Sequence, residues 1–373
     1  MDIGYFLKLM MDRGASDMFL STGTPVHIKI EGRLAALGTS PLPSGMVKKI
    51  AYSLMDEGSV PKFERELEYN MALAVKDVGR FRVNVFKQRG EVALVIRAIK
   101  SDIPSIEELL LPQIYKKLIM EPRGLILVVG ATGSGKSTTL ASMIDYRNTN
   151  SAGHILTIED PIEFLHRDKK GYVNQREIEV DTPSFHAALR ASLRQDPDVV
   201  LVGEMRDLET ISTAIHAAET GHMVFSTLHT LDAVETINRI IAVFPPPEQK
   251  QVRLQLAAVL RSIISQRLVK RTDAEGRVPA VEVMINTAYI RECILVPEKT
   301  RSIRDAIAAG TSQYGMQTFD QSLWDLFQAG LINYETALEN ASNADDFKLR
   351  MQGIASTADI SRQAMQSAGY GGR

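Results

Sequence analysis

The stretch GATGSGKS at 130–137 is the feature that most restricts what this chain can fold into. An apolar run at 125–129 precedes it, and a segment with apolar residues spaced by three and four follows it. This order predicts a strand, a glycine-rich loop and the start of a helix. Glycines let successive backbone N–H groups point at one polyphosphate, and the helix N-terminus adds positive potential. The sequence therefore predicts a nucleotide-binding loop in an α/β domain.

Every residue of this loop is a candidate contact to ATP. Lys136 is expected to reach the β- and γ-phosphates, and Ser137 to hold Mg²⁺. The candidate nucleotide contacts are Gly130, Ala131, Thr132, Gly133, Ser134, Gly135, Lys136, Ser137 and Thr138. Hydrolysis needs more than this loop, because the attacking water must be activated and the developing charge stabilised.

Length and composition exclude several classes of protein. With 373 residues, the chain exceeds the ~250 to 300 residues that one core supports, so we expect two domains. A formal net charge of −2 argues against a general affinity for nucleic acid. The single cysteine, Cys293, excludes an intramolecular disulfide and favours a reducing compartment. No apolar run approaches the ~18 residues of a membrane span, so we expect a cytoplasmic protein.

The first hundred residues predict a small α/β domain, residues 1–100. Apolar spacing predicts an opening helix that Gly14 ends, and Glu31-Gly32 predicts a hairpin turn between two strands. The expected strands are 17–20, 26–30, 33–37, 69–75, 80–86 and 92–99, and the expected helices are 44–55 and 61–68. A polar, proline-containing segment follows, which we interpret as a linker at 101–111.

Beyond the linker, short apolar strands alternate with amphipathic helices, which predicts a mostly parallel sheet covered on both faces. We expect an ATPase domain with C-terminal helices at 112–343 and a partly disordered extension at 344–373, in which 355–373 lack large apolar residues. Besides 125–129, the expected strands are 154–158, 199–202, 223–228 and 279–285. The expected helices are 183–194, 208–220, 232–243, a long one at 248–271, 288–295, 302–309 and 318–329.

Acidic residues follow two of these strands. Glu163 ends the run EDPIE at 159–163, and Glu204 comes two residues after the strand at 199–202. The carboxyl ends of parallel strands meet at the edge where ligands bind, so both are candidates for work beside the loop. Acids after strands also cap helices, and that alternative stays open for each of them.

Two histidines flank the strand at 223–228. His222 and His229 are seven residues apart, so they point to opposite faces of one strand and should not share a role. A histidine at a strand end can sense a γ-phosphate, although a lone histidine is more often structural.

Arginines gather in two places. The alternation of the strand at 80–86 predicts an arginine-rich edge on the N-terminal sheet, and a solvated charged face is its alternative interpretation. That edge comprises Arg80, Arg82, Arg89 and Arg97. In the second domain, pairing with nearby aspartates is expected for Arg190, Arg194 and Arg206, the aspartates being Asp196, Asp198 and Asp207.

Together these motifs resemble the secretion-type ATPases, most closely the type IV pilus retraction motors of the PilT and PilU group. The resemblance rests on the Walker A loop, an Asp box at 155–164, a Walker B box at 199–207 and a His box at 220–230. It implies a PAS-like N-terminal domain, a RecA-like ATPase domain and a homo-hexameric ring with ATP between subunits. The implied setting is the cytoplasmic face of the inner membrane, against a pilus platform protein.

The resemblance also implies roles for individual residues. Glu204 would be the Walker B acid and, with Ser137, a Mg²⁺ ligand, while Glu163 would be the general base. His229 would contact the γ-phosphate region. Arg82 and Arg97 match N-terminal arginines that the family places near the phosphates, which favours a functional arginine edge.

One element departs from the PilT pattern. Where PilT proteins carry AIRNLIR, this chain reads AYIRECI at 288–294, and the stretch after 315 and the C-terminal extension are more similar to PilU. The alternatives are an accessory ring that hydrolyses ATP weakly and scaffolds a paralogous retraction ATPase, or a pilus-extension or type II secretion ATPase. Many pilus-extension and type II secretion ATPases carry a four-cysteine zinc element, and a chain with one cysteine cannot form such an element. A RecA-type DNA motor is disfavoured by the acidic charge balance.

Overall fold

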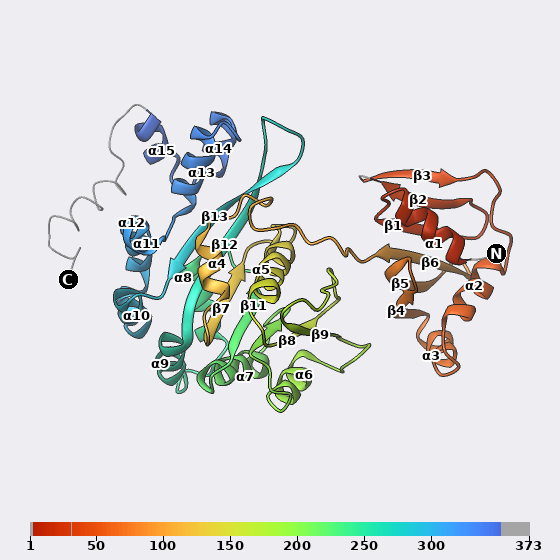
Figure 1. Cartoon of the computed structure of the whole chain (residues 1–373), viewed down its shortest axis with the longest axis horizontal. Coiled ribbons are helices and arrows are strands. Elements are labelled where there is room, and N and C mark those ends of the chain that lie inside the picture. Colours follow the sequence, from red (N-terminus) through yellow and green to blue (C-terminus); the bar gives the residue numbers. More distant parts are fainter. Residues whose placement is uncertain (1–2, 31, 352–373) are drawn as a thin grey trace. The chain divides into compact units, whose positions relative to one another are not determined.

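A computed structural model describes residues 3–30 and 32–351 of the chain. They form two compact units: the residues up to Asp102 together with 162–165, and Ile103–Pro161 together with the residues from His166 on (Figure 1). The predicted α/β class is confirmed, with an antiparallel sheet first, a mostly parallel sheet second and helices toward the C-terminus. The turn at Glu31 and the disorder expected at 355–373 lie outside the described residues.

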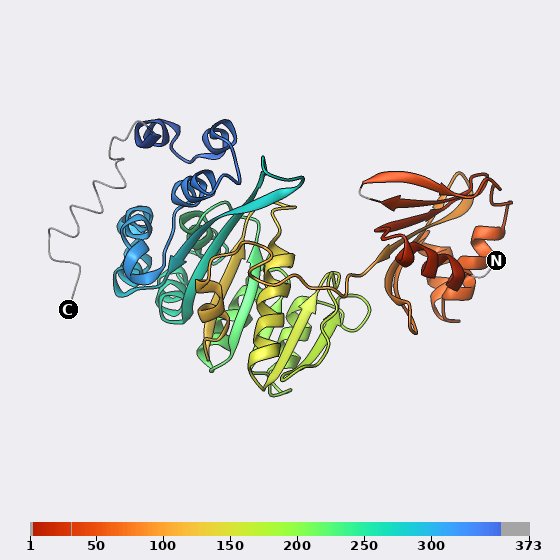
Figure 2. The ribbon, with the colours of Figure 1, turned by 45° about the horizontal axis from the view of Figure 1, so that its top comes forward.

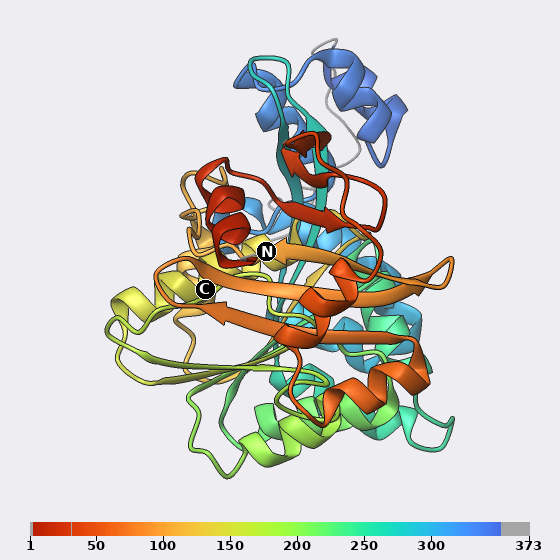
Figure 3. The ribbon, with the colours of Figure 1, turned by 90° about the vertical axis from the view of Figure 1, so that its right-hand side faces the viewer.

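The first unit is one antiparallel sheet in the order β3-β2-β1-β6-β5-β4. On β5, Phe81, Val83 and Val85 are fully buried, and the helices cover this face of the sheet (Figure 3). Alternation therefore leaves the intervening arginines on the other face. The elements are α1 (Ile3–Asp12), β1 (Asp17–Leu20), β2 (Val26–Ile30), β3 (Arg33–Leu37), α2 (Met46–Leu54), α3 (Ser59–Glu66), β4 (Glu68–Val75), β5 (Gly79–Gln88) and β6 (Glu91–Ala98).

The second unit contains a seven-stranded sheet in the order β13-β12-β7-β11-β10-β8-β9, parallel except for β12 with β13. Helices cover both faces (Figure 2). The elements up to β11 are α4 (Ile114–Ile119), β7 (Gly124–Val129), α5 (Lys136–Asn150), β8 (His154–Glu159), β9 (Tyr172–Glu177), α6 (Phe185–Ser192), β10 (Val199–Val202), α7 (Leu208–Glu219) and β11 (Met223–Leu228). They are followed by α8 (Ala233–Ala242), α9 (Gln249–Val259), β12 (Leu260–Lys270) and β13 (Arg277–Ile285).

Strand β7 lies at the centre of the second unit's core. Its residues are all buried, and they alternate between the two hydrophobic clusters on the two faces of the sheet. Leu125 and Leu127 pack into one cluster, and Ile126 and Val128 pack into the other. The strand is thus fixed from both sides, which places the loop that follows it at the carboxyl edge of a rigid sheet.

The long helix predicted at 248–271 is wrong. Helix α9 ends at Val259, and residues 260–270 form strand β12, parallel to β7 on one side and antiparallel to β13 on the other. Leu256, Leu260 and Ile264 are spaced by four and continue a helical pattern, but Ile263 and Ile264 pack into opposite clusters, as strand neighbours do. A strand buried on both faces has no polar alternation to distinguish it from a helix.

The edge strand β9 was not predicted, because its sequence YVNQRE is polar. Two of its outward N–H groups are covered locally: Val173 N–H donates to Asp168 at 2.8 Å, and Glu177 N–H donates to Asp181 at 2.8 Å. Carboxylates thereby occupy backbone positions at which a further strand would otherwise pair.

The C-terminal region is helical. The three predicted helices are confirmed as α10 (Ala288–Leu295), α11 (Ile303–Ala309) and α13 (Phe319–Gln328). Helices α14 (Tyr334–Asn340) and α15 (Ala344–Met351) were not predicted, nor were the short η1 (Pro297–Ser302) and α12 (Thr311–Tyr314). A small core joins Val269 and Val278 of the β12–β13 hairpin to Leu323 and Phe347. Within the described part of the chain, no helix combines the length and apolar content that crossing a bilayer requires.

Candidate nucleotide-binding site

The loop at 130–135 connects β7 to the N-terminus of α5, as predicted. Gly130, Gly133 and Gly135 all have positive φ, at 149°, 76° and 90°, so the loop uses conformations that other residues rarely adopt. The Lys136 side chain is buried, and its Nζ donates to the carbonyls of Gly130 at 2.7 Å and Ala131 at 3.0 Å. The ammonium group therefore lies over the loop, where a bound phosphate would find it.

Gln266 of β12 lies against this loop and was not singled out from the sequence. Its Nε2 donates to the Ser134 carbonyl at 2.8 Å, and its Oε1 accepts from the Thr139 hydroxyl at 2.9 Å. The residue is 3% exposed. The only signal in the sequence is an amide within the mixed stretch IISQRLV at 263–269. A helix at these positions does not predict that this amide is buried beside the loop.

Glu204 and His229 are brought together, because each follows one of two neighbouring parallel strands, β10 and β11. The Glu204 Oε1 lies 3.1 Å from His229 Nε2 and 2.6 Å from Arg206 Nε. Burial raises the pKa of the Glu204 carboxyl, but the hydrogen bond from Arg206 and the charge of His229 outweigh it and hold that pKa below its usual value. Glu204 is therefore an ionised carboxylate at neutral pH.

Two of the three aspartates expected to pair with Arg206 have other partners. Asp207 caps α7 by accepting the Thr210 N–H at 2.8 Å, and Asp198 accepts the His154 N–H at 2.8 Å. Arg206 turns instead to Glu204, two residues before it. The expected Arg206 pairing is thus wrong, because helix capping already uses the neighbouring carboxylate.

His222 and His229 lie at opposite ends of β11. The His222 Nδ1 is 3.0 Å from the Ala217 carbonyl, so the ring donates to the last turn of α7. Its contact is structural, whereas His229 contacts the Walker B acid. The two histidines therefore have different surroundings, as their spacing predicts.

Three residues of the arginine edge, Arg80, Arg82 and Arg97, lie on β5 and β6 of the first unit, and Arg89 lies in the turn between these strands. Arg82 is opposite Arg97 in the register, and the Arg97 Nε lies 2.7 Å from the carboxylate of Asp17, which is 4% exposed. The Arg80 Nε is buried without a hydrogen-bond partner among the described residues. The roles of Arg82 and Arg97 at a phosphate stay predictions.

The acidic run at 159–163 is divided between the two units. Glu159 ends β8 and accepts hydrogen bonds from Thr157 at 2.6 Å and Gln175 at 3.1 Å, so its carboxylate is engaged within the sheet. Glu163 is exposed and lies in the segment 162–165, where the Leu165 N–H donates to the Lys100 carbonyl at 2.9 Å. Its role as general base stays a prediction.

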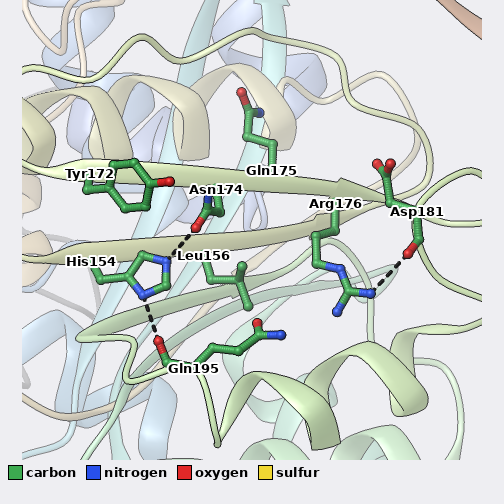
Figure 4. A pocket seen from close by; sticks show the side chains of 8 residues that line it. All are labelled: His154, Leu156, Tyr172, Asn174, Gln175, Arg176, Asp181 and Gln195. Atoms are coloured by element: carbon green, nitrogen blue, oxygen red, sulfur yellow. Dashed lines mark hydrogen bonds between the residues drawn. The ribbon is translucent and has the colours of Figure 1, made fainter.

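A polar pocket of about 620 Å³ opens on β8 and β9 (Figure 4). The His154 ring bridges the Gln195 carbonyl at 3.0 Å and the Asn174 side chain at 2.9 Å, and Arg176 donates to the Asp181 carbonyl at 3.0 Å. None of the sequence-predicted site residues lines this pocket. It is therefore distinct from the phosphate loop.

The oxygen donors near the loop suit Mg²⁺. Ser137 offers a hydroxyl in the first turn of α5, and Glu204 offers an ionised carboxylate at the same edge of the sheet. Mg²⁺ takes few protein ligands and completes its shell with water and substrate phosphates. In residues 3–30 and 32–351, no group of three or more His, Cys, Asp or Glu side chains is placed to hold a metal. A metal here would be held largely by the nucleotide.

Comparison with known proteins gives matches along nearly the whole chain. The family model described as Type II/IV secretion system protein matches residues 3–317. The chain is 42% identical over 360 residues to the type IV pilus ATPase PilU of Pseudomonas aeruginosa, covering 96% of this chain and 94% of that protein. It is 47% identical over 347 residues to the retraction ATPase PilT of the same organism, covering 93% and 100%. Among solved structures, the pilus retraction motor PilT with bound ADP matches with a TM-score of 0.85 and 44% identity, over 93% of this chain and 98% of that one.

Proposed function

Because this chain belongs to the Type II/IV secretion system protein family, we propose that it is an ATP-hydrolysing motor of type IV pilus retraction. One observation carries the proposal. A phosphate loop with Lys136 folded over it stands at the same sheet edge as the ionised carboxylate of Glu204, in a chain that matches PilT and PilU over more than nine-tenths of its length.

Each site residue then has a chemical task. The loop N–H groups and Lys136 bind the β- and γ-phosphates. Ser137 and Glu204 would hold Mg²⁺, which would supply positive charge beside those phosphates. Glu163 accepts the proton of the attacking water. His229 is hydrogen-bonded to Glu204 and contacts the γ-phosphate region, so it connects the γ-phosphate to the Walker B acid. Positive charge for the transition state comes from Arg82 and Arg97.

The proposed assembly is a homo-hexameric ring at the cytoplasmic face of the inner membrane, acting on a pilus platform protein. Arg82 and Arg97 belong to the unit that precedes Ile103, and a ring allows that unit of one subunit to reach the nucleotide of its neighbour. Sequential hydrolysis would then change how the units pack and so move the platform.

A second candidate is an accessory ring that assists a paralogous retraction ATPase. It is favoured by the AYIRECI element at 288–294, which forms most of α10 in place of the PilT pattern, and by the match to PilU. The intact Lys136, Glu163 and Glu204 favour a ring that hydrolyses ATP itself.

Steady-state ATP turnover by the purified full chain tests the proposal, with the oligomeric state recorded in the same sample. Glu163→Gln keeps the shape of the side chain but cannot take a proton, so it should bind ATP and lose turnover. Lys136→Ala should lose nucleotide binding. A wild-type hexamer that binds ATP without hydrolysing it would favour the accessory ring, and wild-type turnover in Glu163→Gln would remove Glu163 from the role of base.

A further inference from the structure

Gln266 is a buried polar side chain whose two hydrogen-bonding ends are both committed to the phosphate-binding segment. The parallel register of β12 and β7 pairs Ser265 with Val129, so Gln266 comes level with the start of the loop. Its amide oxygen accepts from the Thr139 hydroxyl, and this contact orients the amide so that Nε2 donates to the Ser134 carbonyl. One side chain thus connects the loop to the first turns of α5.

The loop backbone lies directly on this residue. A Cβ added at Gly130 would lie 2.4 Å from the Gln266 carbonyl oxygen, and one added at Gly135 would lie 2.7 Å from its Nε2. By contrast, a Cβ at Gly133 would meet nothing within 4 Å. The two glycines that define the GxxxxGK motif are therefore the two that Gln266 contacts.

The geometry of the peptide bond gives this contact a consequence for binding. In a trans peptide the C=O and the following N–H point in opposite directions. Because the Ser134 carbonyl is held toward Gln266, the N–H of Gly135 is directed away from β12. Backbone N–H groups of such a loop are what bind a polyphosphate.

We propose that Gln266 is a positioning residue for nucleotide binding: it holds the Ser134–Gly135 peptide so that its N–H faces the β-phosphate. The proposal rests on the nucleotide-binding role proposed above for the loop. It concerns affinity for the polyphosphate and not for the nucleoside, because the contact fixes only the loop.

Gln266→Glu is the direct test. It keeps an oxygen that accepts from Thr139 and removes the donor to the Ser134 carbonyl. Gln266→Met, of similar length and without either bond, and Thr139→Val, which removes only the orienting bond, are the second and third variants. Gln251→Glu makes the same substitution on an exposed position of α9 and is the control.

Affinities for ADP and AMP are measured by calorimetry and by displacement of a fluorescent ADP analogue. We expect both Gln266 variants to weaken ADP at least tenfold and AMP less than twofold, Thr139→Val to weaken ADP about threefold, and the control to match wild type. General damage to the fold would weaken ADP and AMP by the same factor, and that result, or unchanged ADP affinity, would overturn the proposal. A wild-type chain that binds no ADP would instead refute the proposed function.

Discussion

Two glycines of the phosphate loop make different demands on the backbone, so alanine at each position should have a different effect. Gly133 has a φ of 76° and open space around its Cβ position, whereas at Gly130 a Cβ would lie 2.4 Å from a backbone oxygen of β12. Alanine at Gly133 has only to adopt the left-handed conformation, which costs about 1 kcal/mol. Alanine at Gly130 cannot be accommodated unless the loop moves away from Gln266.

In Gly133→Ala, the cost of the left-handed conformation first lowers the stability of the folded chain. If the loop keeps its conformation in the free and bound states, that cost cancels from binding, and the melting temperature drops by about 2 to 4 °C. If the free loop relaxes, binding must restore the conformation, and about 1 kcal/mol limits the loss of affinity to roughly fivefold. A displaced loop in Gly130→Ala no longer directs its N–H groups at one phosphate, so we expect at least a hundredfold loss, or about 3 kcal/mol.

Calorimetric titration of both variants with ADP and Mg²⁺, beside melting curves without nucleotide, measures the two effects separately. Gly330→Ala is the matched control, since Gly330 has a φ of 72°, open space at its Cβ position and no part in the loop. It should lose stability as Gly133→Ala does and bind ADP as wild type does. Equal loss of affinity in Gly133→Ala and Gly130→Ala would refute the assignment of the steric limit to the contact with β12.

Three further outcomes follow from particular residues. Burial lowers the pKa of His166 to about 4, below the 6.5 of an unfolded histidine, so the unfolded chain binds more protons between these values. The free energy of unfolding, measured by urea denaturation with tryptophan fluorescence, should therefore fall by up to about 2 kcal/mol as pH falls from 6.5 to 4.5. In His166→Gln this decrease should be smaller. Burial raises the pKa of Glu282, so its ionisation costs stability as pH rises. Glu282→Gln keeps an acceptor for the Ala233 N–H and the Ser265 hydroxyl, so its stability relative to wild type should increase as pH rises above 4.5, the pKa of an unfolded glutamate; a difference that does not change with pH would contradict this. Arg82→Ala should lower ATP turnover only in assembled rings, and equal loss of nucleotide affinity in isolated subunits would exclude a role across the subunit boundary.

The elements that the sequence predicts best are those whose periodicity and ends agree. Strands β1, β2 and β3 have the predicted bounds, because alternation defines each one and glycine or polar residues stand between them. The strand-loop-helix unit around Lys136 is equally clear. Polar β9 could not be found this way, since its identity as a strand depends on backbone pairing with β8 and on Asp168 and Asp181, which cover its outer edge.

Within the site, the order of the strands explains one contact. Glu204 and His229 follow strands of a parallel sheet, so their meeting at one edge depends on topology alone. The contact of Arg206 with Glu204 depends on how three residues after β10 turn, and on Asp207 being used as the cap of α7. Periodicity carries no information about such a turn.

The mistaken helix at 260–270 and the omission of Gln266 have the same physical cause. Because β12 is buried on both faces, its apolar residues do not alternate with polar ones, so spacing by three and four fits them as well as alternation does. Interpreted as helix, Gln266 is one polar position among many on an amphipathic surface. When residues 260–270 are interpreted as a strand beside β7, the Gln266 amide is buried away from water. Its hydrogen-bond partners must then come from the segment that follows β7. That segment is the phosphate loop, so pairing β12 with β7 is sufficient to identify Gln266 as a residue of the site.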